Sequence, residues 1–252
     1  RYAKAREIFE ESLKQLGSGM DYYIISTLRY YSIALSKTDY KSEANQLNML
    51  VRMIMMFFTE YKLSFLQEVQ TSEEGIQAWI DRGRISYAGI AGLLIYLLND
   101  GKLSEELRRK LVADIFPSGK YMAQSPKMPS IIGLLADELK VEHSTNKLPS
   151  PYQMVLGLCK SKRRDLDDYF QDKKTDKANT KEVLLFSLRH YYQQNNHENA
   201  TVILDAIEYL QLRFGIFSKM EKRIWAVIKD RITKNFLSNV RVEISPLSNN
   251  GC

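Results

Sequence analysis

Apolar side chains recur along most of this 252-residue chain at steps of three and four, the spacing of one face of an α-helix. The pattern starts at once, with Ala5, Ile8, Phe9, Leu13 and Leu16. Only 12 glycines and 6 prolines interrupt it, whereas a strand-rich fold needs many turns. The sequence therefore predicts an all-α protein of roughly 10–12 helices.

Capping and breaking residues divide this pattern into separate helices. The predicted helical segments are 1–16, 20–37, 40–69 (with a bend near Thr59), 73–98, 104–116, 130–140, 152–160, 166–170, 180–194, 198–214 and 218–237. Within them, residues 88–98 are apolar on nearly every side, which is typical of a helix buried all round. We expect 88–98 to form the centre of the fold, and 240–244 to suit one edge strand.

Proline-rich stretches interrupt the chain near 117–130 and 141–151. Elsewhere the short connections between helices indicate antiparallel neighbours. The predicted organisation is an N-terminal helical half over 1–116, a connecting region with one short helix over 117–151, a C-terminal helical half over 152–239 and a tail over 240–252. The two halves form either separate subdomains or one continuous, irregular stack of antiparallel helical hairpins.

The opening segment 2–13 carries Ala5, Phe9 and Ser12 at relative spacings of four and three. It resembles the second helix of a tetratricopeptide repeat, a family that places alanine, phenylalanine and a small residue at those spacings. The resemblance implies helical hairpins stacked side by side. Because no 34-residue period continues along the chain, an irregular stack of this style is favoured over a regular array. A compact helical bundle is the remaining alternative.

Candidates for catalysis and metal binding are few. Asp168 and Asp172 lie four residues apart and would share a helix face, as Mg²⁺-binding aspartates do in all-α isoprenoid enzymes. However, a second acidic motif is missing and basic residues flank the cluster. His143, His190 and His197 lack the three- or four-residue spacing of a helical metal pair. We therefore expect no catalytic residue, no cofactor and no metal site.

The cysteines and the apolar runs bear on location. The two cysteines, Cys159 and Cys252, do not make a disulfide framework and suit a reducing compartment, and we expect Cys159 to be a buried thiol. The longest apolar runs are far shorter than the ~20 residues that span a bilayer. We expect an intracellular, cytoplasmic protein without a membrane span.

The absence of an initial methionine or signal-peptide pattern predicts a fragment or a trimmed product.

The net charge of +6 is concentrated near the C-terminus. Residues 217–241 hold seven basic and two acidic residues, a balance of +5. The apolar stripe expected to face the core is Phe217, Met220, Ile224, Ile228, Ile232 and Phe236. The outward basic residues predicted to contact a partner are Lys219, Lys222, Arg223, Lys229 and Lys234. Such a face suits phosphates or an acidic protein surface.

Fifteen tyrosines include three doublets, in each of which one ring can face the core and the other can face out. Exposed tyrosine suits interfaces because it offers a large contact area at a small entropy cost. Tyr22, Tyr30 and Tyr192 are therefore further candidates for partner binding.

Together these patterns favour a non-catalytic helical scaffold that binds another protein. The alternative is an RNA- or DNA-binding protein that uses the basic helix over 217–241. A further alternative is a toxin-neutralising immunity protein, a class of all-α proteins similar in size and helix content. The identity of the partner and the oligomeric state are left open.

Overall fold

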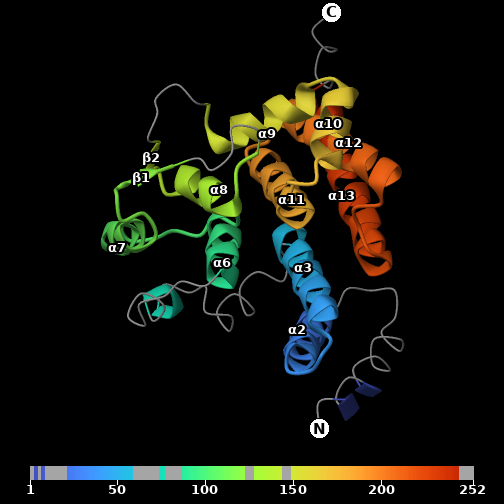
Figure 1. Ribbon diagram of the computed structural model, residues 1–252. Helices are drawn as coiled ribbons and strands as arrows, with labels where there is room; N and C mark the ends of the chain where they lie inside the picture. The colour runs from blue at the N-terminus through green and yellow to red at the C-terminus, as the bar shows by residue number, and fades with distance from the viewer. Residues whose placement is uncertain are drawn as a thin grey trace, which may run out of the picture.

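The computed structural model describes residues 3–4, 7–8, 22–58, 74–77, 87–122, 128–143 and 149–243, without the side chains of 22–26, 87–88 and 237–243. Helices make up most of these residues, which confirms the all-α prediction (Figure 1). Most of the tetratricopeptide-like segment 2–13 lies outside the described residues. The same holds for the second part of the helix predicted over 40–69, including the bend near Thr59.

The helical pattern resolves into elements close to those predicted. The helices are α2 (Tyr22–Ser36), α3 (Lys41–Phe57), α6 (Tyr87–Leu98), α7 (Glu105–Ile115), α8 (Ile131–Glu138), α9 (Pro151–Lys160), α10 (Arg163–Gln171), α11 (Lys177–Gln193), α12 (His197–Phe214) and α13 (Lys219–Glu243). The strands β1 (Lys120–Tyr121) and β2 (Glu142–His143) form a parallel pair in which Tyr121 lies opposite His143.

The last helix is longer than expected. Because α13 continues to Glu243, the edge strand predicted at 240–244 is wrong for residues 240–243. Extending an existing helix adds one backbone hydrogen bond per residue, whereas a new strand needs a partner strand at that place. A short alternation of valines was therefore a weak signal for a strand.

The centre of the fold is α11 and not residues 88–98. It packs against α3, α6, α8, α9 and α12, and its consecutive residues 183–188 are all buried. Consecutive buried positions mean that the helix is covered on every side. In the sequence, the charged residues Glu182 and Arg189 flank this run and argued against a helix buried on every side, yet both side chains are buried.

These two charged residues are buried because each has a partner on another segment of the chain. The Oε1 atom of Glu182 lies 2.6 Å from Nε of Arg52 on α3. Arg189 donates from Nη2 to Oδ1 of Asn99 at 2.9 Å, and Asn99 donates from Nδ2 to the carbonyl oxygen of Met55 at 3.2 Å. Burial lowers the pKa of Arg189. The polar contacts thus connect α11 to α3 and to the residue that follows α6.

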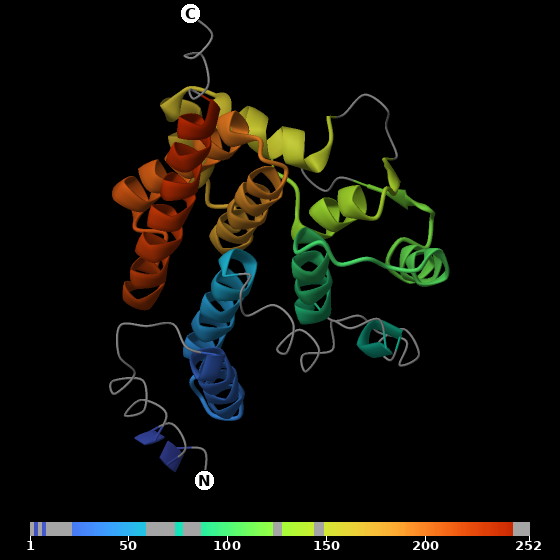
Figure 2. The same ribbon diagram turned by 180° about the vertical axis from the view of Figure 1, so that it is seen from behind.

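The helices surround α11 on several sides. In two opposite views α7 and the β pair lie at one side of the molecule and α13 at the other, with α11 between them (Figures 1 and 2). The α2–α3 hairpin lies at one end and α9 and α10 at the other. A single cluster of buried apolar residues extends through all of these helices. None of the described helices is both long enough and apolar enough to cross a membrane.

Candidate partner-binding surface on α13

The first turn of α13 is fixed by a capping box, which the sequence Ser218-Lys219-Met220-Glu221 encodes. The amide N–H of Glu221 donates to Oγ of Ser218 at 3.4 Å, and the amide N–H of Ser218 donates to Oε2 of Glu221 at 2.7 Å. The other carboxylate oxygen of Glu221 lies 2.7 Å from Nζ of Lys181 on α11. Glu221 is only 1% exposed, so this acidic residue is removed from the surface.

A second contact holds α13 against α12. The indole N–H of the buried Trp225 donates to Oε1 of Glu208, and Nζ of Lys229 donates to Oε2 of the same carboxylate. Glu221 and Trp225 lie four residues apart and therefore share the inward face of the helix. Sequence reasoning missed both residues, although the Ser-x-x-Glu pattern was a readable signal for the first.

The inward face is rotated relative to the predicted one. Phe217, Ile228 and Ile232 are buried as expected, and Ile224 and Phe236 are half-buried. The expectation for Met220 is wrong, because this side chain is 42% exposed. Glu221 takes the inward position beside it, where it can reach both Ser218 and Lys181.

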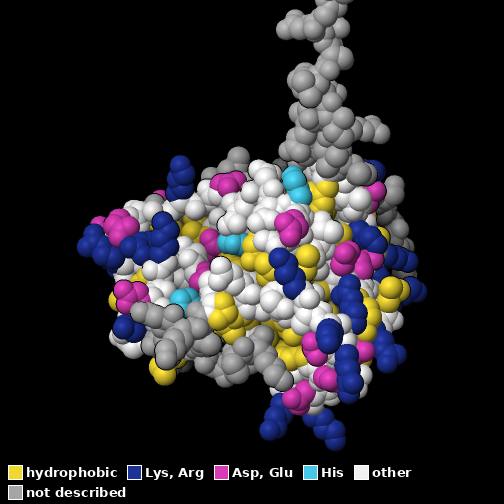
Figure 3. All heavy atoms as spheres, turned by 90° about the horizontal axis from the view of Figure 1, so that it is seen from above, with side chains coloured by type: hydrophobic (Ala, Val, Ile, Leu, Met, Phe, Trp, Pro, Cys, Tyr) yellow, Lys and Arg dark blue, Asp and Glu magenta, His cyan; other side chains and the backbone are white. Residues whose placement is uncertain are grey.

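Part of the predicted basic face is engaged within the chain. Besides Lys229 on Glu208, Lys234 pairs with Asp230 at 2.7 Å one turn away. Arg231 donates to the carbonyl oxygen of Phe57 at 3.3 Å, and its guanidinium lies over the ring of Phe58. Lys and Arg side chains gather along the side of the molecule that holds α10, α12 and α13, with acidic side chains among them (Figure 3).

Three of the predicted cations remain exposed at the surface of α13. Lys219, Lys222 and Arg223 are exposed and form no ion pair with any other described residue. Two exposed apolar side chains accompany them on the same two helical turns, Met220 and Val227, the latter 47% exposed. We call these five residues the cationic patch. The formal charge of these five residues is +3, and Glu221, the acid that lies among them in the sequence, is buried and paired with Lys181.

A hollow of about 150 Å³ lies next to the patch, between the start of α13 and the α2–α3 hairpin. Its lining residues are Tyr31, Leu35, Glu43, Gln46, Leu47, Leu50, Ser218, Met220 and Glu221. We call it the α13 hollow. Met220 belongs to both features, so the hollow and the cationic patch form one continuous surface.

The outward tyrosine is exposed in one described doublet and packed on α13 in the other. In the first described doublet, Tyr30 is 61% exposed and Tyr31 is buried, as predicted. In the other, Tyr191 is buried, and Tyr192 packs its ring on Phe236 of α13 and contacts Asn235 through its hydroxyl group. Tyr192 thus joins α11 to α13. The side chain of the third candidate, Tyr22, lies outside the described residues.

The histidines have structural partners. Nε2 of His143 lies 3.1 Å from Oδ1 of Asp137, and Nδ1 of His190 lies 2.9 Å from Oε1 of Glu138. These pairs tie the end of α8 to β2 and to α11. The ring of His197 packs on Phe236 of α13. Among the residues that the structure describes, no group of three or more His, Cys, Asp or Glu is placed to hold a metal ion.

The aspartates of the acidic cluster in and after α10 make separate contacts and do not converge on one site. Asp172 accepts a hydrogen bond from the amide N–H of Lys174 at 2.9 Å and so closes a turn. Asp167 accepts one from the hydroxyl group of Tyr209 on α12 at 2.7 Å. Asp168 instead lines a groove beside α9. Asp168 and Asp172 therefore have different surroundings despite their spacing.

The thiol of Cys159 is buried as expected, and burial raises its pKa from 9.0 to about 12, a change that the charge of Arg163 opposes. The contribution of this shift to stability is therefore present below pH 9.0 and is lost as the pH rises toward 12.

In a Cys252→Ser variant at about pH 8, we expect iodoacetamide to alkylate Cys159 roughly a thousandfold more slowly in the native than in the denatured protein. Equal rates would contradict this.

The comparisons give no relative for this chain. No family model, no curated protein and no solved structure matches it. Its function must therefore be inferred from its own residues, and the surface formed by the cationic patch and the α13 hollow is the strongest candidate for a binding site.

Proposed function

We propose that this chain is a non-catalytic, intracellular helical scaffold, an irregular stack of helical hairpins, that binds another protein through the cationic patch and the α13 hollow. The observation that carries the proposal is the set of three exposed cations, Lys219, Lys222 and Arg223, that pair with no other described residue and lie beside exposed Met220 and Val227. The opposite face of the same helix is fixed by Glu221 and Trp225. A surface held in place in this way loses little conformational entropy on binding.

The chemistry of the surface defines the partner. An acidic segment would place its carboxylates on Lys219, Lys222 and Arg223, where they gain charge complementarity. An apolar side chain of the same segment would pass Met220 and contact the apolar part of the α13 hollow, which Leu35, Leu47 and Leu50 line. A central apolar anchor within a polar rim is the usual arrangement of a protein interface.

Two features favour a protein partner over nucleic acid. Lys229, Arg231 and Lys234 are already engaged within the chain, which leaves few cations for a phosphate backbone. The exposed apolar side chains add nothing to phosphate binding, which is dominated by Lys and Arg contacts and therefore depends steeply on salt.

A designed peptide tests the proposal. We expect a fluorescent peptide of about ten residues, with several glutamates around one leucine, to bind the protein, and a Lys222→Glu/Arg223→Glu variant to bind it about tenfold more weakly or worse, because like charges would then meet. Fluorescence anisotropy gives both affinities. The matched control is Lys173→Glu/Lys174→Glu, which changes the net charge equally at an exposed loop beyond α10.

Two results would contradict the proposal. One is an equal loss of affinity in both charge-reversal variants, which would show that only the overall charge matters. The other is salt-sensitive binding of labelled RNA or DNA that the Lys222→Glu/Arg223→Glu change abolishes, together with no peptide binding. The second result would establish the nucleic-acid alternative.

A further inference from the structure

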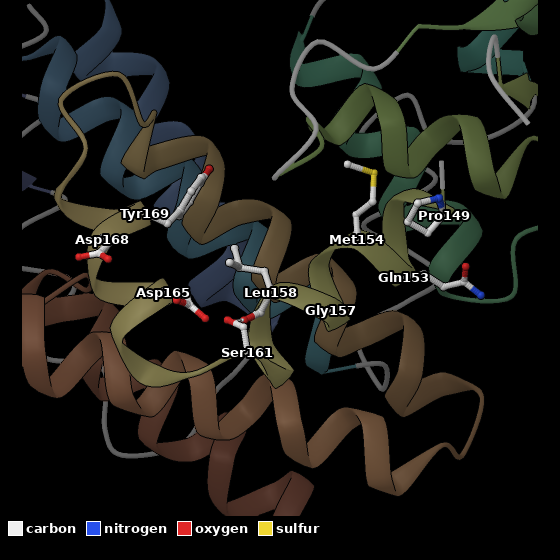
Figure 4. A pocket seen from close by; sticks show the side chains of 9 residues that line it. All are labelled: Pro149, Gln153, Met154, Gly157, Leu158, Ser161, Asp165, Asp168 and Tyr169. Atoms are coloured by element: carbon white, nitrogen blue, oxygen red, sulfur yellow. Dashed lines mark hydrogen bonds between the residues drawn. The ribbon is translucent and has the colours of Figure 1, made fainter. Parts of the chain in front are cut away.

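A second concave surface lies between α9 and α10, at the end of the molecule away from the α2–α3 hairpin (Figure 1). This α9–α10 groove has a volume of about 560 Å³. Its lining residues are Pro149, Gln153, Met154, Gly157, Leu158, Ser161, Asp165, Asp168 and Tyr169 (Figure 4). The lining includes two carboxylates and no basic side chain, although the whole chain is basic.

The floor of the groove contains a glycine that the packing of the chain does not explain. A Cβ atom built on Gly157 would meet nothing within 4 Å, so no neighbouring group requires the missing side chain. Glycine inside a helix is less stable than alanine, because it loses more backbone freedom on folding. The missing side chain at Gly157 instead allows a ligand to approach this point of α9 closely.

The carboxylates of the groove are available to a ligand. One oxygen of Asp165 accepts a hydrogen bond from the amide N–H of Lys162 at 3.2 Å, which orients the group. Figure 4 shows this carboxylate directed toward Ser161 and Leu158. Among the residues that the structure describes, the Asp168 carboxylate makes one distant ion pair, with Arg164 at 3.9 Å, and both side chains are exposed. An exposed pair of this kind contributes little and is easily replaced by a better cation.

We propose that the α9–α10 groove binds a basic peptide segment of a partner protein. An arginine or lysine of that segment would lay its methylene groups over Gly157 and Leu158, because long cationic side chains bury their stems on apolar surface. Its charged group would reach the carboxylates of Asp165 and Asp168, where charge-assisted hydrogen bonds form. This site is separate from the cationic patch, and the proposal holds whether or not the patch binds a partner.

The test uses a labelled alanine-based peptide with two arginines, and the same peptide with neutral citrulline in place of both. We expect the wild-type chain to bind the arginine peptide and not the citrulline peptide. Asp168→Asn is expected to weaken binding at least about tenfold by removing a charged acceptor. The control Asp114→Asn removes one carboxylate from the exposed face of α7 and should leave the affinity unchanged.

Gly157→Leu separates binding from folding. Leucine is a good helix former, so we expect this variant to melt at the same temperature as the wild type or higher. The same side chain occupies the floor of the groove, so we expect the arginine peptide to bind at least about tenfold more weakly. A folded Gly157→Leu variant with unchanged affinity would overturn the proposal, as would equal binding of the citrulline peptide.

The chain's own cationic patch is a competing occupant of the groove. If a second copy fills the groove, the wild-type protein will show a mass that rises with concentration in analytical ultracentrifugation. Asp168→Asn will then convert it to monomers. That result would also overturn the proposed occupant, whereas a wild-type monomer that binds the arginine peptide supports it.

Discussion

Truncation of Phe186 to alanine is expected to lower the free energy of unfolding by about 3–5 kcal/mol. This side chain is 0% exposed and lies in the middle of α11. Because α3, α6, α8, α9 and α12 all pack closely on α11, we expect little collapse of the surrounding groups into the space that the ring leaves. The cost therefore includes the lost burial of the ring and the cavity that remains.

Urea denaturation followed by circular dichroism measures this change. The matched control is Leu212→Ala on α12, whose side chain is 87% exposed, and we expect that change to stay within about 0.5 kcal/mol. If Phe186→Ala costs no more than the control, the assignment of α11 as the packed centre of the fold is wrong.

Replacement of Arg52 by methionine is the second change with a large expected effect. It removes the cation that lies 2.6 Å from the Glu182 carboxylate, whose side chain is 5% exposed. The buried Glu182 carboxylate then keeps the cost of leaving water and loses the attraction of the Arg52 guanidinium. We expect the free energy of unfolding to fall by about 3–5 kcal/mol.

A double-mutant cycle separates the pair from its surroundings. In Arg52→Met/Glu182→Leu both charges are gone, and we expect most of the lost stability to return, because apolar residues of similar volume often replace a buried ion pair without cost. The exposed pair of Lys110 and Glu106 on α7, at 3.0 Å, is the control and should contribute less than about 1 kcal/mol. If removal of the Lys110 charge lowers the free energy of unfolding as much as Arg52→Met does, the Arg52–Glu182 pair does not behave as a buried ion pair.

Local patterns were sufficient to predict the helices. Step sizes of three and four predicted bounds within a few residues of the observed ones for α7, α8, α9, α10, α11 and α12. The two-residue strands β1 and β2 could not be predicted this way, because alternation needs a longer run to be recognised. The parallel pairing of Tyr121 with His143 depends instead on how the chain folds around α8.

The centre of the fold and the candidate surface depended on distant partners. Glu182 and Arg189 are charged and therefore argued against burial of α11, until Arg52 and Asn99 supplied their contacts. In the same way, Lys229 counted as an outward cation because its partner, Glu208, lies on another helix. The sequence could place these charges on helices but could not say which of them would meet.

The central position of α11 has a consequence for the synthesis of the chain. Asn99 makes its hydrogen bond with a residue 90 positions later, and α3 and α6 both pack on the same late helix. A ribosome completes α3 and α6 well before α11 emerges, so the parts of their surfaces that pack on α11 stay uncovered in the meantime. Contacts so far apart in sequence also slow folding, because a long loop must close before they form. We therefore expect the nascent chain to expose these apolar surfaces, and to be most prone to aggregation, until translation has passed Gln193.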